Sequence, residues 1–231
     1  DFFRLPFPND ARIKGGWLDL SGFPTPGPEL LGFDPVKLYV DALQKNESAW
    51  GTTPTVIFRF SGELDFDSFK TEKNGVFPIQ WVDITKGTAE YGTSVGLYFV
   101  YDPNKTSYIC PYAVSVRRPL GAPMVPGHQY AVYMTTAGTG KGGATIERSE
   151  HLVAMLGDAP PSDGALAAAH GKYAPFRDYL KDKLIGTELV LTASVITAGK
   201  VREPMQQLAT ALTTQGVPTA KGWVKCGGGA K

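Results

Sequence analysis

The sequence TVIFRF at residues 55–60 carries the clearest structural signal in this chain. Val56, Phe58 and Phe60 are apolar and alternate with residues that tolerate solvent. Side chains on a β-strand point alternately to the two faces of a sheet, so the pattern predicts a strand with one buried face. A strand of this kind is typical of antiparallel sheets that cover a hydrophobic core on one side.

Similar segments recur along the chain, each rich in β-branched or aromatic residues and bounded by turn-forming residues. They lie at residues 79–85, 95–101, 108–117, 129–136 and 188–198. The 231 residues include 27 glycines and 18 prolines, which suits short strands joined by many turns. The sequence therefore predicts a mainly β fold of the sandwich type, because this spacing of strands and turns is typical of sandwiches. Its expected core comprises Val56, Phe58, Phe60, Leu97, Phe99, Val114, Val116, Val132, Leu189 and Leu191.

The segment before the first strand is irregular. Residues 1–33 hold many prolines together with several aromatic residues, so we expect them to lie over the core without regular structure. A short helix is predicted near 35–45, because Asp34 is a helix-capping residue and Pro35 suits the first helical position.

Helical periodicity returns toward the C-terminus. It appears at 149–156 and 175–185, on either side of Pro160-Pro161, and again near 203–214, before a glycine-rich tail. We therefore divide the chain into three expected parts: an N-terminal segment at 1–33, a β-sandwich domain at 34–200 with a helical insertion at 149–185, and a C-terminal helix and linker at 201–231.

Charge and hydropathy exclude two classes of partner. The formal net charge is +1, with 23 basic and 22 acidic residues, so no overall field attracts nucleic acid. The sequence contains no apolar run of about 18 residues or more, the length that a membrane-spanning helix needs. We expect neither nucleic-acid binding nor a membrane span within this chain.

Three groups of motifs, taken in order, give a resemblance to a known family. They are LPFPND at 5–10, WGTTPTV at 50–56 with FSGELD at 60–65, and RPL at 118–120 followed by VPGHQYAV at 125–132. Together they resemble the N-terminal Ig-like region of bacterial extracellular lipases of the virulence-factor type and of related secreted surface lipoproteins. The resemblance extends to about Ala198.

This resemblance implies an Ig-like sandwich on a bacterial protein at the outer cell surface or outside the cell, with any catalytic domain beyond Lys231. The expected function is a non-catalytic structural or adhesive module, not an enzyme. Its expected partners are the downstream domain of the same polypeptide and a surface protein or polysaccharide. Two alternatives stay open: a ligand-binding module for carbohydrate, lipid or protein, and a small serine esterase or lipase fragment.

The esterase alternative depends on the sequence GTSVG at 92–96, which fits the G-x-S-x-G pattern. A nucleophilic serine in that pattern needs a strand before it and a helix after it. Ser94 instead follows a polar loop and precedes a predicted strand. We therefore expect Ser94 to occupy an ordinary turn.

A second glycine-rich motif, GTGKGG at 138–143, formally fits the G-x-G-x-x-G pattern of phosphate-binding loops. No βαβ unit surrounds it, and no helix is predicted to start directly after it. A hairpin or insertion loop is the favoured interpretation.

Metal ligands are sparse in the sequence. Asp65 and Asp67 could present two carboxylates on one side of a strand or loop, and calcium prefers such oxygen ligands. Aspartates at turns more often bond to nearby backbone, so calcium there is the minor alternative. No other cofactor is expected.

Exposed aromatic side chains would identify a ligand-binding surface. The candidates are Trp50, Trp81 and Tyr91, which could contact a carbohydrate or lipid. Core packing is the favoured interpretation for aromatic residues at strand spacing, and the ligand-binding surface is the alternative.

The sequence contains two cysteines, Cys110 and Cys226. A disulfide between them would tie the glycine-rich tail back to the sheet. Two unrelated thiols are the alternative.

Overall fold

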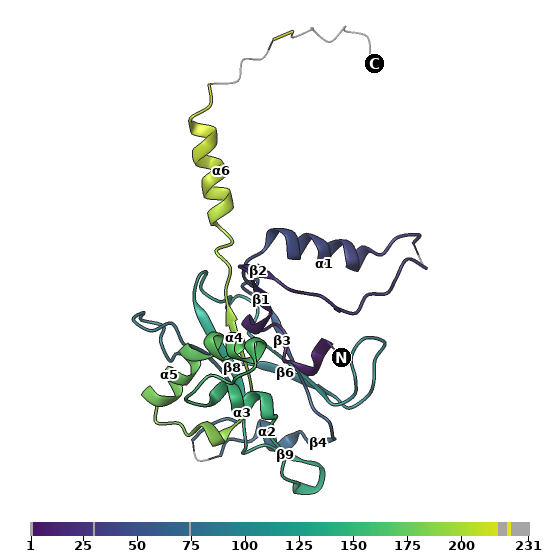
Figure 1. Cartoon of the computed structure of the whole chain (residues 1–231), viewed down its shortest axis with the longest axis vertical. Coiled ribbons are helices and arrows are strands. Elements are labelled where there is room, and N and C mark those ends of the chain that lie inside the picture. Colours follow the sequence, from purple (N-terminus) through teal and green to yellow (C-terminus); the bar gives the residue numbers. More distant parts are fainter. Residues whose placement is uncertain (1, 30, 74, 217–220, 223–231) are drawn as a thin grey trace, which may run out of the picture. The chain divides into compact units, whose positions relative to one another are not determined.

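The computed structural model describes residues 2–29, 31–73, 75–216 and 221–222 (Figure 1). Its contacts divide the chain into two compact units, Asp1–Gly199 and Lys200–Lys231. Within the residues that the structure describes, the first unit contains all the sheets and the second contains one α-helix.

One three-stranded antiparallel sheet has the order β3-β7-β6. Its strands are β3 (Thr55–Arg59), β7 (Ala113–Arg117) and β6 (Tyr98–Asp102). Phe7 of the N-terminal segment adds an antiparallel bridge to the outer edge of β3. Its backbone N–H donates to the Ile57 carbonyl at 3.1 Å, and its carbonyl accepts from the Ile57 N–H at 2.7 Å.

A second three-stranded antiparallel sheet has the order β10-β8-β5. Its strands are β10 (Val190–Thr197), β8 (Gln129–Thr135) and β5 (Ile79–Asp83). In the register of this sheet, Val132 of β8 lies opposite Trp81 on one side and Ser194 on the other. A β-bulge interrupts the pairing of β10 between Val190 and Thr192.

The larger hydrophobic cluster contains side chains from both sheets. Val56 and Phe58 of β3 belong to the same cluster as Trp81 of β5 and Val132 of β8. The predicted alternation in residues 55–60 is confirmed, since Val56, Phe58 and Phe60 are all buried. Leu189 was expected in this core and is 48% exposed, because it ends the 3₁₀ helix η4 (Thr187–Leu189) ahead of β10.

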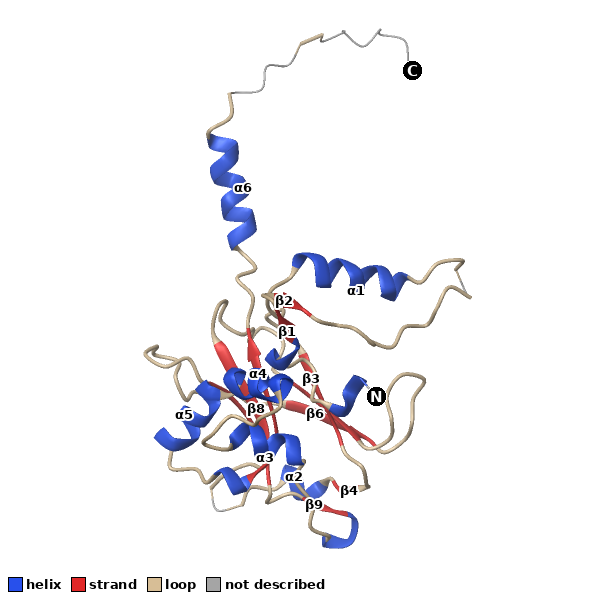
Figure 2. Ribbon diagram, viewed as in Figure 1, coloured by secondary structure: helices blue, strands red, loops and turns tan. Residues whose placement is uncertain are grey.

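A second hydrophobic cluster covers the other face of the β10-β8-β5 sheet. Ala131 and Tyr133 of β8 and Val195 of β10 pack there against three helices. The helices are α3 (Glu150–Leu156), α4 (Gly164–Lys172) and α5 (Ala174–Asp182), and Figure 2 shows them grouped beside β8.

The expectation of a mainly β fold is not clearly supported. Helices contain 30% of the described residues and strands 23%, so the protein combines several antiparallel sheets with α-helices. Part of the helix content that the sequence did not predict is α4, which lies between the two predicted helices of the insertion. Its sequence GALAAAHGK has little alternation between apolar and polar residues, and so it gives no periodic helix signal.

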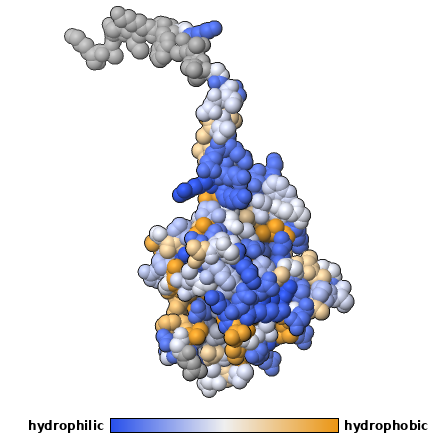
Figure 3. Space-filling view, turned by 90° about the vertical axis from the view of Figure 1, so that its left-hand side faces the viewer, coloured by the Kyte–Doolittle hydropathy of each residue, from blue (hydrophilic) through white to orange (hydrophobic). Residues whose placement is uncertain are grey.

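The outer surface of the helical layer is charged. Asp182 of α5 pairs with Lys86 at 3.0 Å, and Asp178 and Lys181 are also exposed on this helix. Figure 3, which looks at the left-hand side of Figure 1, shows hydrophilic residues across the centre of that face.

The remaining elements of the first unit are short, apart from α1 (Pro35–Asn46). This helix begins as predicted, with the Asp34 carboxylate accepting from the Lys37 N–H at 3.0 Å, and it contains no buried residue. The others are η1 (Phe2–Arg4), η2 (Asp10–Arg12), β1 (Ile13–Lys14), β2 (Trp17–Leu18), β4 (Leu64–Asp65), α2 (Asp67–Lys70), β9 (Thr139–Gly140) and η3 (Lys141–Gly143).

The second unit contains α6 (Glu203–Thr213), close to the helix predicted at 203–214. Its apolar residues Met205, Leu208 and Leu212 are all exposed. Among the described helices of the whole chain, none has both the length and the apolar character that crossing a bilayer requires.

Candidate binding cleft

The N-terminal segment is bound into the first unit through buried polar side chains. Asp10 is 2% exposed, and its Oδ1 accepts from the Trp50 Nε1–H and the Thr197 N–H, both at 2.9 Å. Its Oδ2 accepts from the Thr197 hydroxyl at 2.5 Å. Burial raises the pKa of Asp10 above its ordinary value, and these hydrogen bonds oppose the rise.

Three further hydrogen bonds hold the neighbouring residues. The Asn9 side-chain amide donates to the Tyr173 hydroxyl at 2.7 Å, and that hydroxyl donates to the Ala193 carbonyl at 2.9 Å. The Ser194 hydroxyl donates to the Pro8 carbonyl. The segment expected to lie over the core is thus hydrogen-bonded to β10 and to the residue between α4 and α5.

Aromatic packing fixes the same segment from the other side. Phe2, Phe3, Phe7 and Phe23 contact one another, with ring centroids 5.1–6.1 Å apart. Phe7 also meets Trp50 edge to face at 5.4 Å. Such contacts add to the hydrophobic stabilisation of a segment that has little regular structure.

A cleft of about 600 Å³ opens where the N-terminal segment faces the helical layer. Its walls come from residues 2–12, the end of β3, the start of α3, part of α4 and the first half of β10. The apolar part of the lining is made by Leu5, Leu152, Met155, Leu166, Ala169 and Leu191. The volume lies within the usual range of small-molecule sites.

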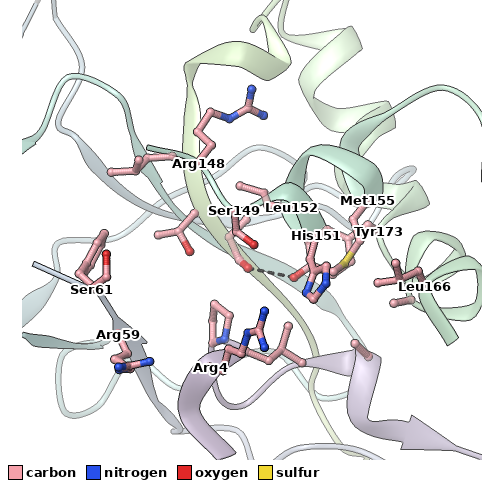
Figure 4. A pocket seen from close by; sticks show the side chains of 18 of the residues that line it. Arg4, Arg59, Ser61, Arg148, Ser149, His151, Leu152, Met155, Leu166 and Tyr173 are labelled. Carbon is pink, nitrogen blue, oxygen red and sulfur yellow. Dashed lines mark hydrogen bonds between the residues drawn. The ribbon is translucent and has the colours of Figure 1, made fainter. Parts of the chain in front are cut away.

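The polar part of the lining is predominantly basic. Four arginines line the cleft, at positions 4, 12, 59 and 148, against the single glutamate Glu147 among the described lining residues. Figure 4 shows Arg4 on the N-terminal side of the cavity, facing Ser149 and His151 on the helical side. The exposed side chains of Arg4, Ser149 and His151 are accessible from solvent.

Two of the four arginines maintain the walls. Arg148 donates to the carbonyls of Val190 and Thr187, at 2.8 and 2.9 Å. Arg12 donates to the Phe2 carbonyl at 2.7 Å and stacks its guanidinium 3.7 Å from the centre of the Phe2 ring. Burial lowers the pKa of Arg12 from its ordinary value. Chemically, the cleft offers cationic and hydrogen-bonding groups beside an apolar surface.

The aromatic residues proposed from the sequence as ligand contacts lie elsewhere. Trp81 is fully buried and Trp50 is 6% exposed, so neither ring presents a face to solvent. Tyr91 is half-buried, packs on Tyr179 and donates its hydroxyl to Asp182 at 2.8 Å. Desolvation, with the Asp182 charge, raises the pKa of Tyr91 to about 12.

The residues proposed for calcium are both exposed. Asp65 ends β4, and the Asp67 carboxylate at the start of α2 pairs with Lys70 at 2.7 Å. Within the part of the chain that the structure describes, no group of three or more histidine, cysteine, aspartate or glutamate residues is placed to hold a metal ion. The calcium site stays a prediction.

The proposed disulfide cannot be placed on the fold. Cys110 is half-buried in the loop before β7. Cys226 lies outside the described residues. The bridge stays a prediction.

Ser94 is exposed in the loop that follows β5, and β6 comes after it, in the order expected from the sequence. Ser94 lies opposite Val82 in an isolated antiparallel bridge, so the two side chains share one face of the sheet. The Asp83 carboxylate, on the next residue, contacts His128 Nδ1 at 2.7 Å. Because successive strand residues point to opposite faces, this pair and Ser94 lie on different faces.

The glycine-rich motif at 138–143 forms a small structural corner. Its residues build β9, which pairs with β4, and then η3. Lys141 is engaged by Glu63 at 2.7 Å. The sequence favoured a loop here; the motif instead forms a two-residue strand followed directly by a 3₁₀ helix.

The residues that line the cleft were not identified from the sequence. Arg4 and His151 are far apart in the chain and belong to no common motif. The one available signal was LPFPND at 5–10, whose polar residues Asn9 and Asp10 are fully or nearly fully buried. Its role in joining the N-terminus to β10 becomes evident only in three dimensions.

Comparison of the chain with protein-family models, with curated proteins and with solved structures gave no match.

Proposed function

We propose that this chain is a non-catalytic, Ig-like structural or adhesive module of a larger bacterial protein. The observation that carries the proposal is the strand order. If β3, β5, β6, β7, β8 and β10 are lettered B, C, D, E, F and G, the two sheets have the orders B-E-D and C-F-G. These are the sheet orders of Ig constant-type sandwiches, in which strand A flanks B. The bridge from Phe7 to β3 occupies the position of strand A.

Tyr130 gives independent support. It lies near the start of β8, the F strand, and its hydroxyl accepts from the Val125 N–H at 2.9 Å. A tyrosine in this position with a bond to backbone a few residues upstream is the tyrosine corner of Ig-like domains. Burial raises the pKa of Tyr130 to about 12.

The C strand supports the same proposal. Trp81 lies on β5 and is completely buried in the cluster shared by the two sheets. Ig domains carry a buried tryptophan on their C strand. The chain departs from the simple pattern between β8 and β10, where residues 136–189 add the helical layer.

Two observations weigh against the esterase alternative. Ser94 lacks the strand-turn-helix context that a nucleophile elbow requires. In addition, the Asp83–His128 pair lies on the opposite face of the sheet from Ser94. The geometry therefore favours a module without hydrolase chemistry of its own.

The cellular setting is part of the proposal and depends on the resemblance of LPFPND and the later motifs to secreted bacterial lipases. We propose that the module lies at the outer cell surface or outside the cell. Its partners would be a downstream domain of the same polypeptide and a surface protein or polysaccharide.

Two measurements on the full chain test the proposal. In solution NMR, cross-strand contacts between backbone amides should link β3 to β7, and should link β8 to both β5 and β10. Contacts that show β3 and β8 as hydrogen-bonded neighbours would refute the Ig-like order. With p-nitrophenyl butyrate as substrate, the chain and its Ser94→Ala variant should both match the uncatalysed rate. Hydrolysis that disappears on substitution of Ser94 would show an esterase.

A further inference from the structure

We infer that the cleft between the N-terminal segment and the helical layer is a binding site for an alkyl anion, a ligand with one anionic head and an unbranched hydrocarbon chain. This inference goes beyond the structural role proposed above, and it depends on the geometry of the cleft alone.

The charge of the lining selects an anion. Four arginines and His151 surround the cavity, with Glu147 as the acidic residue among the described lining positions. Arg12 and Arg148 already donate to backbone carbonyls. Within the described residues Arg4 has no acidic partner, and it faces the cavity. A guanidinium in this setting binds a carboxylate or phosphate through paired hydrogen bonds.

The opposite wall provides the second group of donors. Ser149 and His151 flank the start of α3, across the cavity from Arg4 (Figure 4). A hydroxyl and an imidazole N–H can both donate to anionic oxygens. An anionic head between Arg4 and His151 would therefore be contacted from two sides.

The apolar lining selects the chain. Leu152, Met155 and Leu191 form part of the cleft and are between 3% and 6% exposed, so they belong to the packed walls. Leu166 of α4 adds a less buried apolar side chain beside them. Inorganic anions cannot use this surface, whereas an alkyl chain would displace water from it. Each methylene that becomes buried should tighten binding by about fourfold.

The walls are held before any ligand arrives. The Asn9–Tyr173–Ala193 hydrogen bonds and the Asp10–Thr197 contact fix the N-terminal side of the cleft relative to β10. Arg148 fixes the entry to α3 through Val190 and Thr187. A site whose walls are ordered in advance loses less conformational entropy on binding.

Isothermal titration calorimetry on the full chain tests the inference. The probes are acetate, octanoate and decanoate, with decyl phosphate as a second head group and octyl glucoside as a neutral amphiphile, all below their micellar concentrations. Affinity should rise by about fourfold per added methylene from octanoate to decanoate. Acetate should bind at least tenfold more weakly than decanoate, and octyl glucoside at least tenfold more weakly than octanoate. Decyl phosphate has one more alkyl carbon than decanoate, so an affinity ratio above about fourfold in its favour identifies a phosphate head group and a ratio below it identifies a carboxylate.

Three variants connect the binding to the cleft. Arg4→Ala should weaken decanoate binding by at least tenfold, and Arg4→Lys should restore part of it, because the charge returns without the paired geometry. Leu166→Glu should abolish binding, while Arg202→Ala, an exposed arginine of the second unit, should leave it unchanged. Melting curves verify that each variant is folded. Both substitutions of Arg4 change an exposed residue, so neither should disturb the packed core.

Several outcomes would overturn the inference. Equal affinity of the Arg4→Ala and Arg202→Ala variants for decanoate would exclude the cleft. Equal affinities of octanoate and decanoate would show that no chain is buried. Octyl glucoside that binds as tightly as octanoate would show that the charge has no role.

Discussion

The Asp10 carboxylate allows a sharp test of how the N-terminal segment is held. Substitution by alanine removes an acceptor for three donors: the Trp50 Nε1–H, the Thr197 N–H and the Thr197 hydroxyl. Substitution by asparagine removes the charge but keeps the shape. Its Oδ1 can accept from the first two donors, and its amide N–H can donate to the Thr197 hydroxyl oxygen.

The two variants should differ widely in stability. A buried donor left without an acceptor costs about 1–3 kcal/mol. Asp10→Ala leaves these three donors without their acceptor. Two of them, the indole N–H and the backbone N–H, are fixed in direction and cannot turn to another partner. We therefore expect the free energy of unfolding to fall by about 3 kcal/mol for Asp10→Ala, and by less than about 1 kcal/mol for Asp10→Asn.

The dependence on pH separates the charge from the hydrogen bonds. Burial raises the folded-state pKa of Asp10 above its ordinary value of 3.8, so the folded protein holds the proton more tightly than the unfolded chain does. The stability that this group contributes is present below pH 3.8 and is lost as pH rises through the folded pKa. This loss should disappear in Asp10→Asn, which should gain stability relative to the wild type as pH rises above about 4.

Urea denaturation followed by tryptophan fluorescence, repeated from pH 4 to pH 8, provides the measurement. Trp50 donates to Asp10 directly and reports on the same site. The reasoning would be refuted if Asp10→Ala and Asp10→Asn were equally stable at pH 7. It would also fail if the difference between Asp10→Asn and the wild type did not change with pH.

Three further predictions concern the sheets and the N-terminal segment. Tyr130→Phe should lower the free energy of unfolding by about 1–3 kcal/mol, because the Val125 N–H loses its acceptor. Tyr98→Phe, at an exposed position, should have little effect. Chemical denaturation compares the two variants, and equal losses of stability would contradict the tyrosine corner. Phe58→Ala should cost about 3–5 kcal/mol in the same assay, since the ring is fully buried, and a loss below about 1 kcal/mol would contradict its core position. Deletion of residues 1–33 should lower the melting temperature and promote aggregation visible by light scattering; an unchanged melting temperature would show that the segment is dispensable.

The strands were largely predictable because their signal is local. Alternation in TVIFRF identified β3 within one residue, and the apolar run at 129–136 identified β8. The strand expected at 108–117 begins only at Ala113. Tyr112 just before it has a φ of +64°, a left-handed conformation that cannot continue a strand. Sequence pattern alone did not reveal that conformation, because tyrosine rarely adopts it.

The cleft was not predictable, because it depends on contacts between distant segments. Nothing in the sequence near Arg4 indicates that it faces His151, and the docking of Asn9 onto Tyr173 spans 164 residues. For the aromatic residues the sequence favoured core packing, and the burial of Trp50 and Trp81 agrees with it. Trp81 packs between the sheets and Trp50 packs against Phe7 of the N-terminal segment, so neither ring forms the alternative ligand surface.

The Asp10–Thr197 contact also has a consequence for the order of folding. It joins residues 187 positions apart, near the two ends of the first unit. During synthesis the N-terminal segment leaves the ribosome before the rest of the first unit, and its partners on β10 emerge near the end of that unit, so its docking has to wait for nearly the whole unit. Contacts of such long range slow folding, because the chain entropy is lost before the contacts form. A nascent chain that stops before Val190 should therefore stay sensitive to proteases, and protection should appear only once Thr197 has emerged.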